Sequence, residues 1–498
     1  MPSKGKAANV EKSAEEKLFK NFATLGVGNY GNAVAELFVT ENISNSDYVG
    51  GMLRHNSSQG GIKNVDLSNK FYDTGLDLTY GSVNRNLSWT ADLGYKNQIY
   101  NWYGVSQDLI AEIPAIKDIN PKQTYNTFYA GGRLALGDSF MKESTMKYTR
   151  FWDAFASTEN RLVIKPSMAF DIADKKIKTD FVLDYLSGSF NQNIYGGESY
   201  KYGFTNVGFQ PSLKIQNDDL TLNVGAGFFY SAAQKSGESK FFFYPQITGA
   251  YNVVEDLMIL YAGLEGGLKQ NSYHDFAQEN FFVSPTLIIA PTDQKYDIYA
   301  GLKGKLMSNV SYNISGSYKN EDNRALYKSN GFDYYNANKN GYAYGNSFAV
   351  VYDRLKTVSF FGELKADLSK NVSFGVDGTF SSFSTTNQKE AWNLPAVTLS
   401  SKLDVTITSK WYAGVNLFFV GERKDLLHFE SLNPVPADEV ITLKSYFDLN
   451  ANVGYKYNDQ LSFFLKGNNL ANQNYQRWAN YPVQGLQILA GANYKFDF

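Results

Sequence analysis

Residues 486 to 498 end the sequence as Leu-Gln-Ile-Leu-Ala-Gly-Ala-Asn-Tyr-Lys-Phe-Asp-Phe. Apart from Leu489, apolar residues occupy the even positions, and Gln, Gly, Asn, Lys and Asp occupy the odd ones. Successive side chains of a strand point to opposite faces, so one face is apolar and ends in the aromatics Tyr494, Phe496 and Phe498. A soluble edge strand would not normally carry such a face. A transmembrane β-strand turns it toward lipid, so the stretch predicts a C-terminal membrane-insertion strand.

The same alternation recurs along the chain from Asn21 onward. In 87–95, Leu, Trp, Ala, Leu and Tyr alternate with Ser, Thr, Asp and Gly, and 310–319, 411–419 and 447–456 repeat the pattern. Segments of alternating hydrophobicity separated by turn residues are typical of barrels with lipid outside and a polar lumen inside. The predicted strands include 146–157, 286–306, 310–320, 411–424 and 440–457.

Short turn signals rich in Asn, Asp and Ser join alternate pairs of these segments. They lie at 44–47, 83–86, 173–176, 217–219, 255–256, 308–309, 369–371, 409–410 and 458–460, with a longer link at 138–144. About ten such turns on the periplasmic side, with both termini there, imply about twenty-two strands, an even number. The predicted fold is all-β: an antiparallel transmembrane β-barrel of about 22 strands with short periplasmic turns and longer extracellular loops.

The composition agrees with a membrane barrel and excludes several other classes. Phe, Trp and Tyr make up 16% of the 498 residues, the mean hydropathy is −0.35, and no apolar run is long enough to cross a bilayer as a helix. The formal net charge of −2 gives no reason to expect nucleic acid as a partner. Because the chain has no cysteine, disulfides, thiolate metal sites and cysteine nucleophiles are excluded.

The N-terminus divides from the barrel near residue 20. Residues 1–20 form a polar leader, either a short helix with Ser13 and Glu16 as a capping box or a disordered charged segment, and 21–498 form the barrel. Met1 is not followed by an apolar core or a cleavage site. Since an outer-membrane protein must be exported, we interpret Met1 as an artificial or truncated start.

One long loop carries an apolar stripe. Residues 105–123 contain Leu109, Ile110, Ile113, Ile116 and Ile119 near helical spacing, interrupted by Pro114. Such a stripe needs a cover. It either packs against neighbouring loops and the barrel mouth or forms a docking surface for a partner protein. Residues 321–345, rich in Asn and Tyr, are a second long loop, suited to glycans or peptides or simply solvated.

The sequence shows no motif for catalysis, metal binding or cofactor binding. The histidines His55, His274 and His428 are far apart and show no metal-ligand spacing. His55 lies beside Ser57 and Ser58, but no carboxylate partner can be named, so we expect neither an enzyme nor a bound cofactor. Charged residues of mixed sign are expected to line the lumen as a solvated or mutually paired wall: Asp77, Asp92, Arg133, Lys303, Lys305, Glu363, Lys365, Asp367, Lys402 and Asp404.

The last thirty residues carry a family resemblance. The resemblance is to the C-terminal end of TonB-dependent receptors, and it is carried by Asn468-Asn469-Leu470, Tyr475, Gly485 before the last strand, and Tyr494-Lys495-Phe496. Residues 475–485 resemble the Bacteroidota-type members of that family. The start also resembles that family's first barrel strands. Two features depart from the pattern. Leu486 stands where the family often has Arg, and the twenty residues before Asn21 cannot hold the family's plug domain and TonB-binding segment.

The resemblance implies a multi-pass protein of the Gram-negative outer membrane that takes up a surface ligand, here without its plug. A barrel of this size leaks unless its lumen is filled. We therefore expect the plug to have been removed with the signal peptide, to be a separate chain, or to be replaced by loops or a partner that close the pore. The alternative function is a non-transporting barrel, a subunit or scaffold of an outer-membrane assembly, secretion or surface-lipoprotein complex, and a passive pore is a third. Expected partners are outer-membrane lipid, a separate plug, a surface lipoprotein or other complex subunits.

Overall fold

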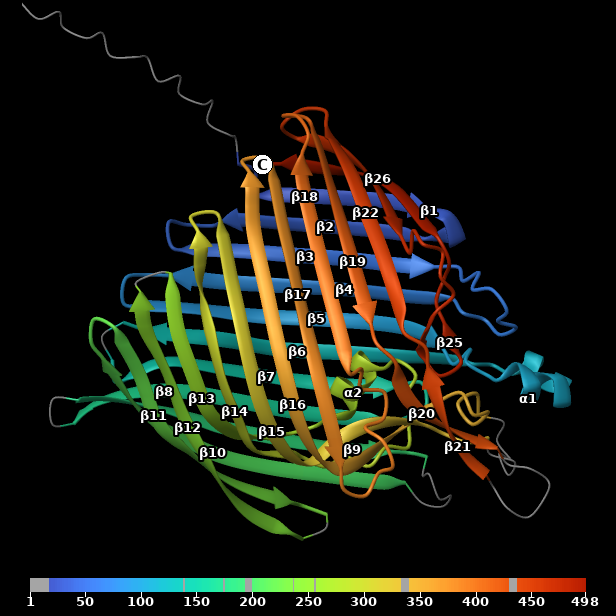
Figure 1. Cartoon of the computed structure of the whole chain (residues 1–498), viewed down its shortest axis with the longest axis horizontal. Helices are drawn as coiled ribbons and strands as arrows, with labels where there is room; N and C mark the ends of the chain where they lie inside the picture. Colours follow the sequence, from blue (N-terminus) through green and yellow to red (C-terminus); the bar gives the residue numbers. More distant parts are fainter. Residues whose placement is uncertain are drawn as a thin grey trace, which may run out of the picture.

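The computed structural model describes residues 18–137, 139–172, 175–192, 199–235, 237–254, 257–332, 340–429 and 437–498. Figure 1 shows strands wound into a barrel, with α1, β20 and β21 at one end and the C-terminus at the other. The first strand begins at Asn21. Most of the predicted leader, residues 1–17, lies outside the described residues.

The strands and helices follow one another along the chain with these bounds: β1 Asn21–Gly28, η1 Asn29–Gly31, β2 Ala33–Asn42, β3 Asp47–Ser58, β4 Phe71–Val83, β5 Leu87–Asn101, α1 Gln107–Glu112, η2 Pro114–Asp118, β6 Lys122–Leu136, β7 Met141–Asp153, β8 Thr158–Ile172, β9 Lys175–Phe190, β10 Tyr200–Gln216, β11 Leu220–Ala233, β12 Ser239–Val254, β13 Met258–Lys269, α2 Tyr273–Glu279, β14 Thr292–Met307, β15 Val310–Ser329, β16 Phe348–Ser369, β17 Val372–Thr385, β18 Val397–Thr406, β19 Trp411–Val420, β20 Arg423–Phe429, β21 Ala437–Leu443, β22 Tyr446–Lys456, β23 Leu461–Asn468, β24 Gln476–Trp478, β25 Tyr481–Pro482 and β26 Gln487–Phe496.

The main sheet closes on itself. It has 22 strands, each pairing antiparallel with the next, while the short hairpins β20–β21 and β24–β25 stay outside it. Closure is made by β26, which pairs with β23 on one side and with β1 on the other, in the register Asn21↔Phe496 to Gly28↔Leu489. The predicted fold class, an antiparallel barrel of about twenty-two strands, is confirmed.

The alternation in the last strand sorts its side chains as predicted. Ala490 and Ala492 lie opposite Val27 and Leu25, whose side chains are 69% and 66% exposed on the outer face. Leu489, which breaks the sequence pattern, takes the inner face and packs beside Gly26. The apolar outer face therefore continues across the point where the barrel closes.

Glycines on the inner face make room for tyrosine rings on neighbouring strands. An added Cβ on Gly94 would overlap the ring of Tyr129, and one on Gly454 would overlap the ring of Tyr412. Each glycine therefore lets a ring lie flat across the adjacent strand, which fits the expectation that a strand glycine marks a close approach.

The two ends of the barrel differ. Short turns such as 43–46, 84–86 and 457–460 join strands at what we call the turn end, and the longer connections lie at the opposite, loop end. The large apolar clusters of buried residues lie at the loop end. Among the described residues, no helix combines the length and the apolar content that crossing a bilayer requires.

Two predicted strands begin at different places in the structure. The strand predicted at 146–157 is β7, Met141–Asp153, because Glu143 faces the lumen and pairs with Arg133 at 2.7 Å. Its polar start therefore looked like part of a longer link. The strand predicted at 286–306 is β14 and begins only at Thr292. Prolines at 285 and 291 lack the N–H that strand pairing needs, so 286–291 belong to the preceding loop.

Two other predicted boundaries move at the loop end. The strand predicted at 310–320 continues as β15 to Ser329, past a register shift between Glu321 and Arg324, so only the later part of 321–345 is loop. The segments predicted at 411–424 and 440–457 each divide in two. Their loop-end parts pair with each other as β20 and β21, away from the barrel wall.

Candidate functional site

The connection between β13 and β14 folds into the barrel. We call residues 270–291 the inner loop; it contains α2, Tyr273–Glu279, whose first turn is capped by the Ser272 hydroxyl accepting from the Asp275 N–H at 3.0 Å. Its side chains contact inner-face residues from β5 to β10 and from β15 and β16. A short segment that reaches such separate parts of the wall on their inner face lies inside the lumen, where Figure 1 places α2.

Glu159 on β8 holds the start of α2. The residue is 2% exposed, and its carboxylate accepts the backbone N–H groups of Tyr273, at 2.7 Å, and His274, at 3.0 Å. It also accepts the Tyr202 hydroxyl of β10 at 2.7 Å. The two amides are among the helix-start donors that have no partner within the helix, so the carboxylate satisfies them.

Two further polar contacts fasten the same helix. The Tyr273 hydroxyl donates to Asp153 of β7 at 2.7 Å. Arg161 of β8 pairs with Asp184 of β9 at 2.7 Å and with Asp275 of α2 at 2.9 Å. Although burial alone would raise the pKa of Asp275, its hydrogen bond with His274 and the charge of Arg161 outweigh burial and lower that pKa to about 2. We call Glu159, Asp153 and Arg161 the latch.

An apolar core joins the inner loop to the barrel wall. Tyr273, Phe276 and Val283 of the inner loop are buried in one cluster with aromatic and aliphatic residues of several strands. On one side these are Tyr125, Phe151, Leu186, Phe190 and Tyr202, and on the other Tyr327, Phe348 and Val350. The cluster therefore bridges β6–β10 and β15–β16, which are not neighbours in the sheet.

A second loop completes the cover. We call residues 469–486, between β23 and β26, the last loop. The ring of Tyr481 stacks on Phe282 of the inner loop, with ring centroids 3.7 Å apart, and lies edge-on to Tyr103 at 4.8 Å. Gln484 donates to the Ser58 hydroxyl and to the Gly60 carbonyl, both at 2.7 Å. The inner and last loops, together called the cap, thus reach from β3 to β16.

A cavity of about 740 Å³ opens beside the cap at the loop end. We call it the upper cavity. Its lining includes the aromatic residues Tyr200, Phe204, Phe242 and Tyr352 and the charged Asp293 and Arg354, and Ile289 of the inner loop forms part of its wall. The lining also holds Glu238, Lys240, Asp322 and Asp353, so charged groups are as prominent in it as aromatic ones. Small-molecule sites of this size usually combine apolar walls with polar groups that orient the ligand.

A second cavity, of about 650 Å³, lies deeper in the lumen against the wall strands β5–β9. Its lining includes Lys147, Lys165 and Asp92 of the wall and His274 and Asp275 of the inner loop. Because Ile289 faces the upper cavity and His274 faces this one, the inner loop borders both.

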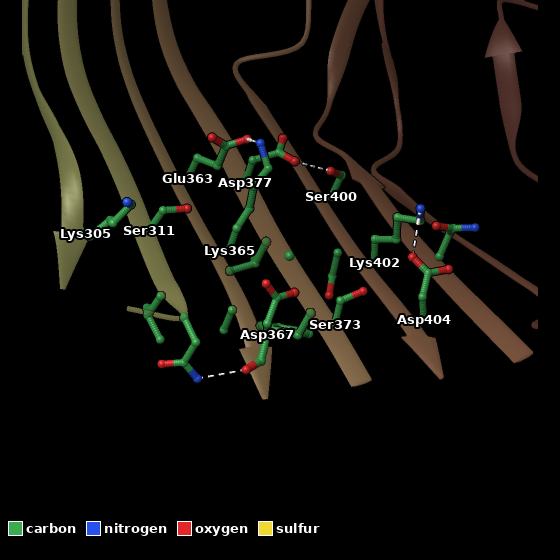
Figure 2. Close-up of a pocket in the computed structure, with 18 of the residues that line it drawn as sticks. Lys305, Ser311, Glu363, Lys365, Asp367, Ser373, Asp377, Ser400, Lys402 and Asp404 are labelled. Carbon is green, nitrogen blue, oxygen red and sulfur yellow. Dashed lines mark hydrogen bonds and ion pairs between the residues drawn. The ribbon is translucent and has the colours of Figure 1, made fainter. Parts of the chain in front are cut away.

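Nearer the turn end, the lumen wall is striped with charge. Figure 2 shows this wall, which lines a cavity of about 620 Å³. Strand register places Lys305, Lys365 and Lys402 in one row, between a row with Glu363 and Asp377 and a row with Asp367 and Asp404. Lys365 pairs with Glu363 at 2.6 Å and Lys402 with Asp404 at 2.8 Å. Two of the lysines thus pair with acids of the adjacent rows.

Other residues singled out in the sequence find local partners. His55 bonds the hydroxyls of Thr74, at 2.8 Å, and Ser57, at 3.0 Å. His274 belongs to α2, whereas the side chain of His428 lies outside the described residues. Asp77 pairs with Arg54 at 2.6 Å, and Lys303 lies over the ring of Tyr261. His55 and His274, the two histidines whose side chains the structure describes, thus lie on different elements and share no partner.

The predicted membrane-insertion residues end the barrel at its turn end. Tyr494 and Phe496 lie ring to ring, with centroids 5.9 Å apart, and Phe496 meets Phe498 edge-on at 5.5 Å. The Phe498 side chain is 83% exposed. Their aromatic surface therefore continues the outer face beyond the last paired residue.

The apolar stripe of 105–123 is gathered into one cluster. Ile110 of α1 and Ile116 of η2 are buried with Leu67 and Val105, and Leu109, Ile113 and Ile119 pack against them half-buried. Neighbouring loops therefore provide the intramolecular cover that was one of the two expectations. Docking of a partner on these five residues stays a prediction, and it requires the stripe to be uncovered.

The pattern of alternating hydrophobicity did not predict that residues 270–291 fold into the lumen, although one feature of the sequence points to it. Residues 281–290 read Phe-Phe-Val-Ser-Pro-Thr-Leu-Ile-Ile-Ala, an apolar run without period-2 alternation and with a proline inside it. Such a run fits neither a lipid-facing strand nor a solvated loop, so it indicates a buried connection.

No family model and no curated protein matches the sequence. Solved structures, in contrast, match nearly the whole chain. The siderophore receptor PirA from Acinetobacter baumannii has a TM-score of 0.70 at 13% identity, covering 96% of this chain and 80% of that one. The FrpB iron transporter from Neisseria meningitidis has a TM-score of 0.72 at 11% identity, covering 97% and 81%. The ferripyoverdine receptor of Pseudomonas aeruginosa has a TM-score of 0.67 at 14% identity, covering 98% and 72%.

These neighbours define the class of fold as the large closed barrels of receptors and transporters. More particularly, they are TonB-dependent receptors, so the resemblance predicted from the last thirty residues is confirmed at the level of the fold.

Proposed function

We propose that the chain is an outer-membrane receptor or transporter barrel for a surface ligand. The observation that carries this proposal is the match of 96% to 98% of the chain to barrels of receptors and transporters. In this proposal the apolar outer face meets lipid, the short turns face the periplasm, and the loop end faces outward, as in other outer-membrane barrels.

The upper cavity is the proposed binding site for the surface ligand. It lies at the loop end, where an external ligand arrives first, and combines aromatic walls with Asp293 and Arg354. The neighbours' names include a siderophore receptor, an iron transporter and a copper transporter. Metal chelates are therefore the first ligand class to examine. Gating by a plug domain and an energised inner-membrane partner, which the family resemblance implies, belongs to the same proposal.

A second function has one observation in its favour. The cap covers the lumen at the loop end with a buried apolar core, which suits a barrel that holds partners and transports nothing. A separate plug, a surface lipoprotein or other outer-membrane complex subunits would be its partners. The stripe at 109–119 is the proposed contact for one of them once the loops that cover it move away.

A binding screen separates the two functions. Purified full-length protein in detergent is mixed with ferric catecholate, ferric hydroxamate and copper chelates, and retained metal is measured by mass spectrometry. Receptor function predicts saturable retention of one class, reduced at least tenfold by Phe242→Ala with Asp293→Asn and unchanged by Lys402→Ala on the distant lumen wall. Retention of none, together with a stoichiometric protein partner after mild detergent extraction, contradicts it and supports the scaffold.

A further inference from the structure

We infer that the inner loop is a plug supplied by the barrel itself, held across the lumen by the latch and displaced as a unit when the lumen opens. This inference goes beyond the proposed function, because a receptor and a scaffold would both need a barrel that does not leak. It rests on three features: the span of the loop across the lumen, the way its ends are fixed, and the partners that the latch keeps on the wall.

The first feature is the span. The polar contacts of the inner loop start at β5, where Gln278 donates to Gln98 at 2.8 Å, and continue through β7 and β8 to β10, where Gln270 accepts from Asn206 at 2.8 Å. On the other side, Ser284 N–H donates to the Phe348 carbonyl of β16 at 2.9 Å. A segment bonded to both of these parts of the wall crosses the lumen between them.

The second feature is the way the two ends of the inner loop are tied together. The Asn271 side-chain amide, buried to 3% exposure, donates to the Ala290 carbonyl and to the Thr292 hydroxyl, both at 2.8 Å. The Thr292 hydroxyl in turn donates to the Asn323 carbonyl of β15 at 2.7 Å. The ends are thus pinned to the wall beside each other, so the residues between them can move as one body while the barrel stays intact.

The third feature is that each latch residue has a second partner on the wall. Glu159 also accepts the Tyr202 hydroxyl, and Arg161 also pairs with Asp184. Asp153 also accepts the N–H groups of Phe155, at 2.9 Å, and Ser157, at 2.8 Å. Leaving a charge buried without any partner is strongly unfavourable. When the inner loop leaves, each of these three side chains keeps a partner on the wall. No charge is then buried without a partner, so the contact with the inner loop can break and form again.

The inner loop places large apolar side chains inside a polar lumen, which is favourable only if they are covered. Phe276, Val283, Leu287 and Ile289 are buried inside a lumen whose wall nearer the turn end carries paired charges. Apolar groups in a water-filled channel gain stability only by covering one another and the wall. The inner loop does this by packing against aromatic rings from both sides, and the same packing keeps water out of the buried core between them.

Ion conductance of the purified full chain in planar lipid bilayers tests the inference. The unmodified chain should insert and stay silent. A variant in which residues 273–288 are replaced by a short Gly-Ser linker, with Asn271 and Ala290 kept, should give a large and steady conductance. Folding of each variant is checked by its faster migration on gels before heating. Steady conductance of the unmodified chain, or silence of a folded linker variant, overturns the inference.

Point variants test the latch without removing the loop. Glu159→Gln with Tyr273→Phe should raise the frequency of brief openings about tenfold or more, because a hydrogen bond to a charged group is worth about that factor. The matched control is Glu265→Gln, which changes a wall carboxylate of β13 that accepts the Tyr299 hydroxyl of β14 at 2.7 Å and bonds the wall instead of the inner loop. Equal opening frequency in the latch variant and the control overturns the role of the latch. These readouts need no ligand, so they stand apart from the binding screen.

Discussion

The ring of Phe282 lies on the ring of Tyr481, with centroids 3.7 Å apart and an interplanar angle of 20°. One ring belongs to the connection between β13 and β14, the other to the connection before the last strand. Residues 199 positions apart in the sequence thus meet over the lumen, and the two halves of the cap stabilise each other through them.

Truncating one ring should loosen both loops. Tyr481→Ala removes a buried side chain that contacts Phe282, Tyr103 and Phe348, and such truncations cost about 3 kcal/mol or more. We expect limited proteolysis to cut the inner and last loops much faster in this variant. Phe241→Ala, which removes an exposed ring of the outer face, serves as the control. Equal cutting rates in both variants would show that the stacked pair does not hold the cap.

Acid should weaken the latch through Asp275. Because its pKa in the closed cap is lowered to about 2, the ionised form favours the closed state at every pH above the ordinary Asp value of about 3.9. That contribution is lost as the pH falls from about 4 toward 2. The protection of the α2 amides, which is the slowing of their exchange compared with that of an unstructured chain at the same pH, should therefore fall over this range. In Asp275→Asn the exchange should be faster already at pH 6, and its acid dependence should be smaller; an unchanged acid dependence would contradict the assignment.

The inner-face glycines that make room for tyrosine rings should differ in their tolerance of a methyl group from a glycine with open space around it. Gly454→Ala would push a methyl group into the ring of Tyr412, whereas Gly375→Ala meets only the flexible Lys365 side chain at 3.9 Å. Overpacking of this kind costs about 1–3 kcal/mol. The unfolding temperature, followed by gel migration after heating, should fall for the first variant and stay unchanged for the second. A fall of the same size in both would mean that ring placement is not the cause.

Untying the loop ends should free the inner loop without unfolding the barrel. Asn271→Ala removes two buried hydrogen bonds and leaves the Ala290 carbonyl without that donor, at a cost of about 1–3 kcal/mol. Hydrogen exchange should rise across 272–290 and stay constant in β14. Asn223→Ala, which removes a lumen-wall amide bonded to Thr248 at 3.2 Å, should change neither. Exchange that rises equally in β14 would show that the wall itself had loosened.

The barrel could be predicted from the sequence because its strands obey a local rule. From Leu87 to Tyr95, side chains that face lipid are apolar and side chains that face the lumen are small or polar. Because successive side chains face opposite sides, the sequence alternates between the two kinds. The rule weakens at the strand ends. Glu143 and Glu321 belong to strands, but they lie among other polar residues, and there the alternation that marks a strand disappears.

The cap could not be predicted in the same way because its contacts are not local. Tyr273 meets Asp153 across 120 positions, and Tyr481 meets the carbonyl of Asn346 across 135. Nothing in the residues around Glu159 marks it as the acceptor for a helix start 114 positions away. The apolar run at 281–290 indicates a buried segment, but only the closed barrel shows what covers it.

Site-directed spin labelling of the last strand tests the membrane barrel most directly. The chain has no cysteine, so single cysteines can be placed in turn from Ile488 to Lys495 in the full chain reconstituted in lipid vesicles. We predict that labels at 488, 490, 492 and 494 collide with oxygen dissolved in the bilayer. Labels at 489, 491, 493 and 495 should instead collide with a water-soluble nickel chelate. Accessibility without this period of two, or nickel access at every position, would contradict a barrel whose outer face lies in lipid.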